Sequence, residues 1–281
     1  MSILVIGGVT IDQLHLVGQP APITTPGGAG TYTALAGACA GASVTLFAQR
    51  PNPLPEILQP IAQSLHWIGP EIPLADLPRL EIAHYGGGKA ALLTAHWGAQ
   101  ARLTPDALPA DLSEYRFIHL TVMATPQRQL DFLHTCRERS NGRSGSGALI
   151  SAGTNGKTAY GETETVRALI RQTDLFFMNE NEANALFGSV DNAHAEPGKR
   201  LFITLAERGS LVLDGQTRTY LPAPTVNELD PTGAGDTFCG ATLAGLARGL
   251  DPVYAAREGV QLASEMIQGM GPEVLLGACG R

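Results

Sequence analysis

The chain has few basic residues and few cysteines, and it lacks a long hydrophobic run. Lys and Arg number 19 against 26 Asp and Glu, so the formal net charge is −7. Because polyphosphate backbones are met by basic surfaces, this balance argues against nucleic acid as a partner. The opening apolar run, Ile3–Ile6, is too short to span a bilayer and has no basic segment or cleavage site beside it. We therefore expect no membrane association and no secretory leader.

The cysteines are scattered along the chain, at Cys39, Cys136, Cys239 and Cys279. Their separations match neither the short spacing of a metal site nor a disulfide framework. The sequence thus predicts free thiols and a reducing, cytoplasmic location.

Short apolar runs alternate with helical patterns, which predicts an α/β fold with a doubly wound, mostly parallel sheet. We expect one domain over residues 1–281. An Asp214-Gly215 turn predicts a late hairpin, followed by helices from Gly235 to about Arg248 and from Pro252 to about Ile267. The predicted buried strands are Ile3–Ile6, Val44–Ala48, Phe117–Leu120, Ala148–Ile150, Leu175–Met178 and Phe202–Leu205.

Extended segments at about residues 12–18 and 80–98 do not fit this alternation, and the second is divided by Gly86-Gly87-Gly88. They are either surface hairpins or a small β lid over the open end of the sheet, where ligands of such folds bind. We favour the lid.

The most informative motif runs from Asp230 to Asp236 and contains Gly233, Ala234 and Gly235 directly before the aspartate. Small residues at a helix start let consecutive backbone N–H groups bind an anion such as a phosphate. An aspartate beside that anion is placed to accept a proton from an attacking hydroxyl. The alternative is a plain helix N-cap at Asp236. The pattern favours a phosphotransferase.

Several pieces, in this order, resemble the ribokinase/PfkB carbohydrate kinases. This resemblance implies a ribokinase-like fold and transfer of the ATP γ-phosphoryl group, with Mg²⁺, to a hydroxyl of a sugar or cyclic polyol. A nucleoside acceptor is the alternative within the family. The matching pieces are Gly7 to Asp12, Gly27-Gly28-Ala29-Gly30, Asn179-Glu180-Asn181-Glu182, Thr204 to Gly209, and Asp230 to Asp236.

The resemblance implies catalytic roles at the last motif. Asp236 would be the general base, and the N–H groups of Gly233, Ala234 and Gly235 would form the anion hole. Asn179 and Glu182 would orient Mg²⁺ and its waters. From the residues alone, an Asn followed three positions later by Glu is equally a helix capping box.

Binding roles follow in the same way. Asp12 would hold substrate hydroxyls, although an aspartate after a strand is commonly a turn former. Gly27 and Gly28 would let the backbone approach the substrate, with Tyr32 as an aromatic floor. The strand end at Thr204, Ala206 and Gly209 would line the nucleotide.

The chain also departs from the better-known sugar kinases of this family. Tyr32 stands where many members have a sugar-binding asparagine, no glutamate lies near Ala124, and Lys157 replaces an arginine. Since a site built for particular hydroxyls rejects other substrates, we do not expect ribose itself as the acceptor.

Two other functions compete with this interpretation. Ser151–Thr158 nearly matches a phosphate-binding loop, as in an ATP-dependent ligase, but Ser151 replaces its first glycine and no clear helix is predicted after it. Lys157 is kept as a phosphate contact. A ligand-sensing kinase homologue is the other alternative, and the presence of Asp236 and Glu182 favours catalysis over it. Relatives often pair through their lids, which predicts a homodimer, and the sequence leaves monovalent-cation activation open.

Overall fold

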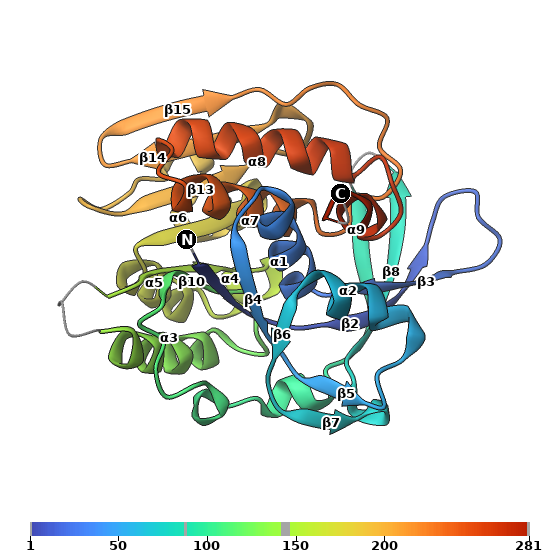
Figure 1. Cartoon of the computed structure of the whole chain (residues 1–281). Coiled ribbons are helices and arrows are strands. Elements are labelled where there is room, and N and C mark those ends of the chain that lie inside the picture. Colours follow the sequence, from blue (N-terminus) through green and yellow to red (C-terminus); the bar gives the residue numbers. More distant parts are fainter. Residues whose placement is uncertain (1, 87–88, 142–146, 280–281) are drawn as a thin grey trace.

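The computed structural model describes residues 2–86, 89–141 and 147–279. Its main sheet has nine strands in the order β15-β14-β13-β12-β11-β10-β1-β4-β6 (Figure 1). The pairs from β6 to β13 are parallel, and β13-β14-β15 is antiparallel. The predicted mostly parallel sheet is therefore confirmed. The strands are β1 (Ser2–Ile6), β4 (Ser43–Phe47), β6 (His66–Ile68), β10 (Tyr115–Leu120), β11 (Leu149–Gly153), β12 (Leu175–Asn179), β13 (Arg200–Thr204), β14 (Ser210–Asp214) and β15 (Thr217–Leu221).

Helices cover both faces of this sheet (Figure 1). Alternate residues of β1 point to opposite faces, so Ile3 and Val5 enter one apolar core while Leu4 and Ile6 enter the other. No helix in the described ranges is long and apolar enough to cross a membrane. The first core packs against α1 (Ala29–Cys39), α2 (Gln59–Ser64), α7 (Ala234–Ala247), α8 (Pro252–Met266) and α9 (Glu273–Cys279), and the second against α3 (Pro126–Ser140), α4 (Gly156–Gly161), α5 (Thr163–Gln172) and α6 (Glu180–Phe187).

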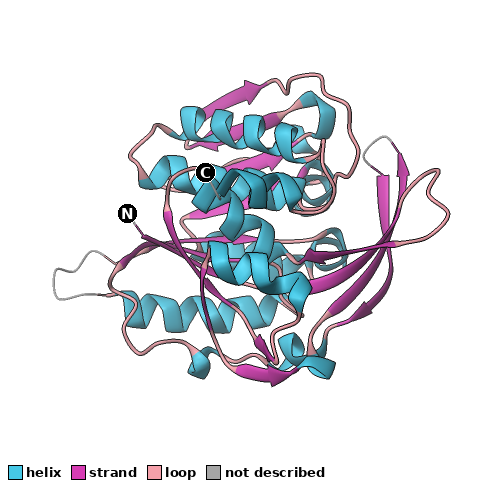
Figure 2. Ribbon diagram, turned by 45° about the vertical axis from the view of Figure 1, so that its right-hand side comes forward, coloured by secondary structure: helices cyan, strands magenta, loops and turns pink. Residues whose placement is uncertain are grey.

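A second sheet stands to one side of the main sheet (Figure 2). Its strand order is β3-β2-β8-β9, and the two segments expected to form a lid lie in it. Gly87 and Gly88, within the expected lid turn, lie outside the described residues. The strands are β2 (Thr10–His15), β3 (Ile23–Gly27), β8 (Arg79–Gly86) and β9 (Lys89–His96); a further pair is β5 (Arg50–Asn52) with β7 (Glu71–Pro73).

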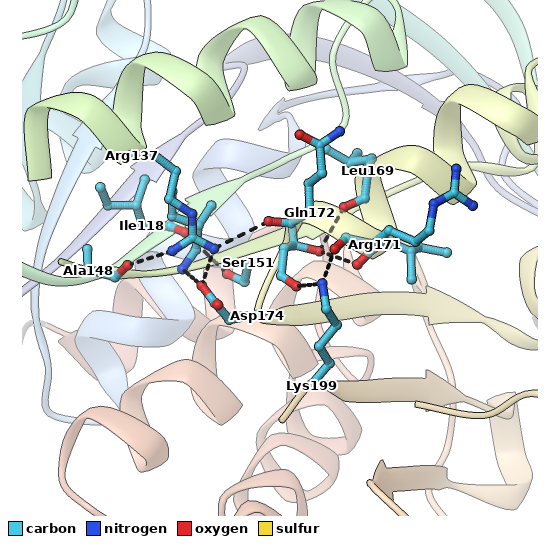
Figure 3. A network of polar contacts seen from close by, with 12 residues as sticks. Ile118, Arg137, Ala148, Ser151, Leu169, Arg171, Gln172, Asp174 and Lys199 are labelled. Carbon is cyan, nitrogen blue, oxygen red and sulfur yellow. Dashed lines mark hydrogen bonds and ion pairs between the residues drawn. The ribbon is translucent and has the colours of Figure 1, made fainter. Parts of the chain in front are cut away.

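At the amino ends of β11, β12 and β13, a polar network holds neighbouring parallel strands together (Figure 3). The Arg137 guanidinium donates to Asp174 Oδ2 at 2.7 Å, and the same oxygen accepts from the Ile150 N–H. Lys199 Nζ donates to the carbonyls of Arg171 and Thr173. Ligands of open parallel sheets bind at the opposite, carboxyl ends of the strands. The network therefore lies away from the edge where a ligand is expected.

A disulfide joins Cys39, at the end of α1, to Cys279 in α9. The expectation of free thiols is therefore wrong for these two residues. The two cysteines are 240 residues apart in the sequence, so their pairing could not be predicted from spacing. In the structure α9 packs on α1, and their Cα atoms lie 4.9 Å apart. Cys136 and Cys239 are free, as expected, and both are buried.

Candidate active site

A cavity of about 190 Å³ lies between the lid and the start of α7. Two carboxyl side chains, Asp12 and Asp236, reach it from residues far apart in the sequence. The structure thus brings most of the predicted catalytic and substrate-binding residues to one place. The cavity is lined by Gly8, Thr10, Asp12, Gly28, Ala29, Tyr32, Leu80, Ile82, Trp97, Gln100, Val122, Thr232, Gly233 and Asp236.

Asp236 is the third residue of α7, and the N-cap of that helix is Gly233 with φ 78°. The alternative of a capping aspartate is therefore wrong. Among the described residues the Asp236 carboxyl has no hydrogen-bonding partner, and it lines the cavity. Burial raises its pKa to about 7. Such a carboxyl is suited to accept a proton near neutral pH.

The turn before Asp236 presents backbone N–H groups. Within the described ranges, those of Gly233 and Gly235 have no protein acceptor, while the Ala234 N–H donates to the Pro231 carbonyl at 3.1 Å. Asp230 holds the turn, since its Oδ1 accepts from the Thr232 N–H at 2.9 Å and its Oδ2 from the Gly271 N–H at 2.8 Å. Free amides at a helix N-terminus are suited to bind an anion.

Tyr32 packs its ring against this turn, where a Cβ at Gly233 would lie 2.4 Å from the ring. The side chain is buried, and its hydroxyl has no partner among the described residues. Burial, and then the charges of nearby carboxylates, raise the pKa of Tyr32 well above its ordinary value. Tyr32 therefore stays a neutral phenol beneath the cavity.

Asp12 lies within β2 rather than in a turn, so the turn-former alternative is wrong. Its carboxyl is buried, accepts a hydrogen bond from Thr10 Oγ1 at 2.5 Å, and has its pKa raised to about 7, mainly by burial. A Cβ at Gly27 would lie 1.9 Å from Asp12 Oδ2, and one at Gly28 (φ 94°) would lie 2.5 Å from the Gly8 carbonyl oxygen. The double glycine is required by this close packing.

Asn179 and Glu182 form the capping box of α6. Glu182 Oε2 accepts from the Asn179 N–H at 2.8 Å, and Asn179 Oδ1 accepts from the Glu182 N–H at 2.9 Å. Burial first, and the negative charge of Asp236 as well, raise the pKa of Glu182 to about 7. The described residues contain no cluster of three or more His, Cys, Asp or Glu that could hold a metal. A lone buried carboxylate with an adjacent amide fits a Mg²⁺ ion that keeps most of its waters.

The expected nucleotide-binding residues lie at the same edge of the sheet, outside the lining of the cavity. Thr204 ends β13 and pairs with Asn179 of β12. Ala206 (φ 52°) opens the short 3₁₀ helix η6 (Ala206–Arg208), and Gly209 (φ 107°) closes it. A Cβ at Gly209 would lie 2.0 Å from the Leu221 carbonyl oxygen, so this turn requires glycine.

Lys157 lies in α4, just after β11. The prediction that no helix follows the near-match phosphate loop is wrong, because Asn155 caps α4 by accepting from the Thr158 N–H at 2.9 Å. That capping box was not recognised in the sequence. Ser151 belongs to β11 rather than to a loop, so the structure gives no support to a phosphate-binding loop here.

Three side chains of the site region were not predicted from the sequence. Trp97 lies directly before the 3₁₀ helix η3 (Gly98–Arg102) and Gln100 lies within it, and both line the cavity. His84 of β8 places Nε2 3.0 Å from Thr232 Oγ1. The available signals were the position of Trp97 at the end of the predicted lid segment, that of Gln100 just after it and, for His84, the alternation with Leu80 and Ile82.

The comparisons with known proteins agree with this geometry. The family model described as pfkB family carbohydrate kinase matches residues 85–276. The chain belongs to this family. It is therefore a kinase, and the predicted resemblance is confirmed.

Among curated proteins, a cytidine kinase of Thermococcus kodakarensis is 27% identical over 96% of this chain and 98% of its own. Among solved structures, a probable sugar kinase from Rhizobium etli has a TM-score of 0.81 at 19% identity, covering 96% of this chain and 94% of that one. A ribokinase from Cryptococcus neoformans in complex with ADP has a TM-score of 0.78 at 20% identity, covering 99% and 98%. These structural likenesses support the ribokinase fold.

Proposed function

We propose that this pfkB-family kinase transfers the γ-phosphoryl group of ATP to a hydroxyl of a small polyhydroxylated substrate, with Asp236 as general base. The observation that carries the proposal is the Asp236 carboxyl, which lacks a hydrogen-bonding partner in the described chain, has a pKa of about 7, and lies beside unbonded amides at a helix start. A base whose pKa is close to the working pH is partly ionised at that pH and still binds a proton strongly enough to remove it from a hydroxyl.

The acceptor would lie in the cavity between Asp12 and Asp236. Asp12 would accept hydrogen bonds from hydroxyls that do not react, and so orient the reacting one toward Asp236. Charge that develops on the transferred group would be stabilised by the amides of Gly233 and Gly235, and by that of Ala234 shared with Pro231. The lid would limit access of water to the reacting groups.

ATP would lie along the carboxyl ends of β11 to β13, against Thr204, Ala206 and Gly209, with Lys157 near its phosphates. Asn179 and Glu182 would hold Mg²⁺ through its waters. When bound, that ion neutralises phosphate charge and polarises the phosphoryl oxygens.

Within the class of acceptors, one observation favours a nucleoside over a bare sugar or cyclic polyol. The cavity adds an apolar and aromatic wall to its carboxyl groups, formed by Leu80, Ile82, Trp97 and Val122. A nucleobase offers such a wall a larger, flat apolar face than the C–H face of a sugar or cyclic polyol does. Similarity over almost the full length to a cytidine kinase points the same way. Ribose is not the proposed acceptor. Pairing through the lid and a cytoplasmic location stay predictions.

The decisive test is Asp236→Asn, assayed by ADP release with ATP–Mg²⁺ and a panel of sugars, cyclic polyols and nucleosides. We expect turnover to fall by about 10²–10⁴-fold, because the amide does not take the proton. ATP binding, measured by calorimetry, should persist. Turnover comparable to wild type would show that Asp236 is not the base.

The metal role is tested by Glu182→Gln. The amide keeps the cap of α6 in part but removes the negative charge, so half-maximal activity should need more Mg²⁺, by roughly tenfold. Titration of activity against Mg²⁺ at saturating ATP gives the measurement. An unchanged Mg²⁺ requirement would leave Glu182 with its capping role alone.

A further inference from the structure

The carboxamide of Gln100 is buried in the wall of the substrate cavity without a partner for its oxygen. Gln100 is 5% exposed and lines the cavity. Among the described residues, its Oε1 has no hydrogen-bond donor. The carboxamide lies flat on Gly8, where a Cβ would be 2.5 Å from Oε1 and 2.6 Å from Nε2. Because an unpaired buried acceptor is unfavourable, a ligand in this cavity that brought a donor to Oε1 would be stabilised by it.

The backbone that carries this side chain is held in place independently of any ligand. The Gln100 N–H donates to the Trp97 carbonyl at 3.0 Å, and the Leu103 N–H to the Gln100 carbonyl. From outside the cavity, Gln49 Nε2 donates to the Ala99 carbonyl at 2.9 Å. Gln100 is thus presented from a fixed turn, as specific recognition requires.

The neighbours of Gln100 in the cavity wall indicate what it meets. Trp97, Ile82 and Val122 give an aromatic and aliphatic surface, while Asp12 and Asp236 line the same cavity. An apolar wall that contains one carboxamide suits a flat ring with a polar edge. Carboxamides pair with such edges through one donor and one acceptor.

We propose that Gln100 is a specificity-determining residue, which recognises the polar edge of a nucleobase in the acceptor while Trp97 lies against the base. The inference rests on the proposed kinase function and deepens it. Gln100 takes no part in phosphoryl transfer. It sets the preference for nucleosides over acceptors that have no nucleobase.

The test compares kcat/KM for cytidine, uridine, ribose and myo-inositol in wild type and Gln100→Met, which keeps the length of the side chain and removes its polar atoms. For the preferred nucleoside we expect a fall of about 10–100-fold, mainly in KM. For acceptors without a nucleobase, the change in kcat/KM should stay below about threefold. The preference for nucleosides should therefore collapse.

Two further variants separate recognition from folding. Gln49→Leu removes a buried glutamine that supports the same turn without lining the cavity, so it should weaken the preference for nucleosides in the same direction but less than Gln100→Met does. Gln100→Glu keeps an acceptor for the cytosine amino group or the uracil N3–H and loses the donor, so it should lose part of the activity on both nucleosides and change little for acceptors without a nucleobase. Thermal melting of each variant reports on folding, and Gln100→Glu decides if Gln100→Met does not fold.

The inference is overturned by an equal loss on every acceptor in Gln100→Met, by no loss at all, or by a wild-type enzyme that prefers ribose or inositol to both nucleosides. These results differ from failure of the proposed function. If the proposed function itself fails, wild type transfers phosphate to no acceptor, or Asp236→Asn remains fully active. The role proposed for Gln100 is then wrong as well.

Discussion

Three carboxyl groups at this site, Asp12, Glu182 and Asp236, have pKa values raised to about 7, and burial is the largest cause for each. Burial disfavours the charged form, so each group carries an energetic cost when it is ionised at neutral pH. Asp236 must nevertheless be ionised to act as a base. Around Asp236, the proposed base, the site therefore gives up stability for function.

This conflict predicts a pH-dependent effect of Asp236→Asn on stability. The folded-state pKa is above the unfolded value, so the folded protein binds more protons, and its stability falls as pH rises from about 4 to 7. At pH 8 the neutral amide should raise Tm, by roughly 2–4 °C for each 1 kcal/mol relieved. At pH 5 Asp236 is protonated in the fold but ionised in the unfolded chain, so the gain should be smaller than at pH 8, and it should vanish only below about pH 4. Calorimetric melting at both pH values measures it, and an equal gain at both would contradict the raised pKa.

Residues whose role follows from local spacing were predictable from the sequence. Asp236 and its glycines are consecutive, so their chemistry is visible without the fold. Gln100 and His84 are different, because an unpaired carboxamide or a contact from lid to turn exists only after distant segments meet. Glu182 is a third case, because an Asn followed three residues later by Glu is typical of a capping box and also of a metal site. The structure contains the capping box.

At the scale of elements, a side chain of the predicted lid contacts the turn before α7. His84 of β8 is buried, and its Nε2 lies 3.0 Å from Thr232 Oγ1 and 3.5 Å from Asp230 Oδ1. The Asp230 carboxylate also fixes this turn, because it accepts hydrogen bonds from the N–H groups of Thr232 and Gly271. The position of the lid is thereby coupled to the turn that would bind the phosphoryl group.

We therefore expect His84→Ala to loosen the lid. The KM of the acceptor should rise roughly tenfold, from loss of a buried polar contact. ATP hydrolysis without acceptor should increase relative to transfer, because water is excluded less well. His15→Ala is the matched control, as His15 is a lid histidine that pairs with Glu81. Identical kinetics in both variants would show that His84 has no special role.

The main elements were predictable because hydrophobic periodicity reports burial. The parallel strands other than β6 were predicted from their short apolar runs, and helices α7 and α8 from their start and stop signals. Shorter elements were missed for physical reasons: α4 has only six residues and depends on its capping box, and α9 has only seven. Strand β3 pairs with β2 across a loop that has no alternating pattern.

For the whole molecule, the disulfide between Cys39 and Cys279 predicts a measurable thiol count. Native protein purified without reductant should label slowly, since Cys136 and Cys239 are buried, and should show two thiols after denaturation. Cys279→Ser should lower the free energy of unfolding by about 2–4 kcal/mol. The double variant with Cys39→Ser should lose little more, as both changes break one bond. Four thiols in the denatured, unreduced protein would show that the bond does not form.

The hydrogen bond from the Gly271 N–H to Asp230 has a consequence for how the protein is made. On the ribosome, Asp12 and strand β2 leave the exit tunnel well before Asp236 and Gly271 do. Until those later residues follow, the nascent chain holds only one side of the proposed acceptor site. A ligand that needs both sides of that site would therefore stabilise only the chain that has folded around it.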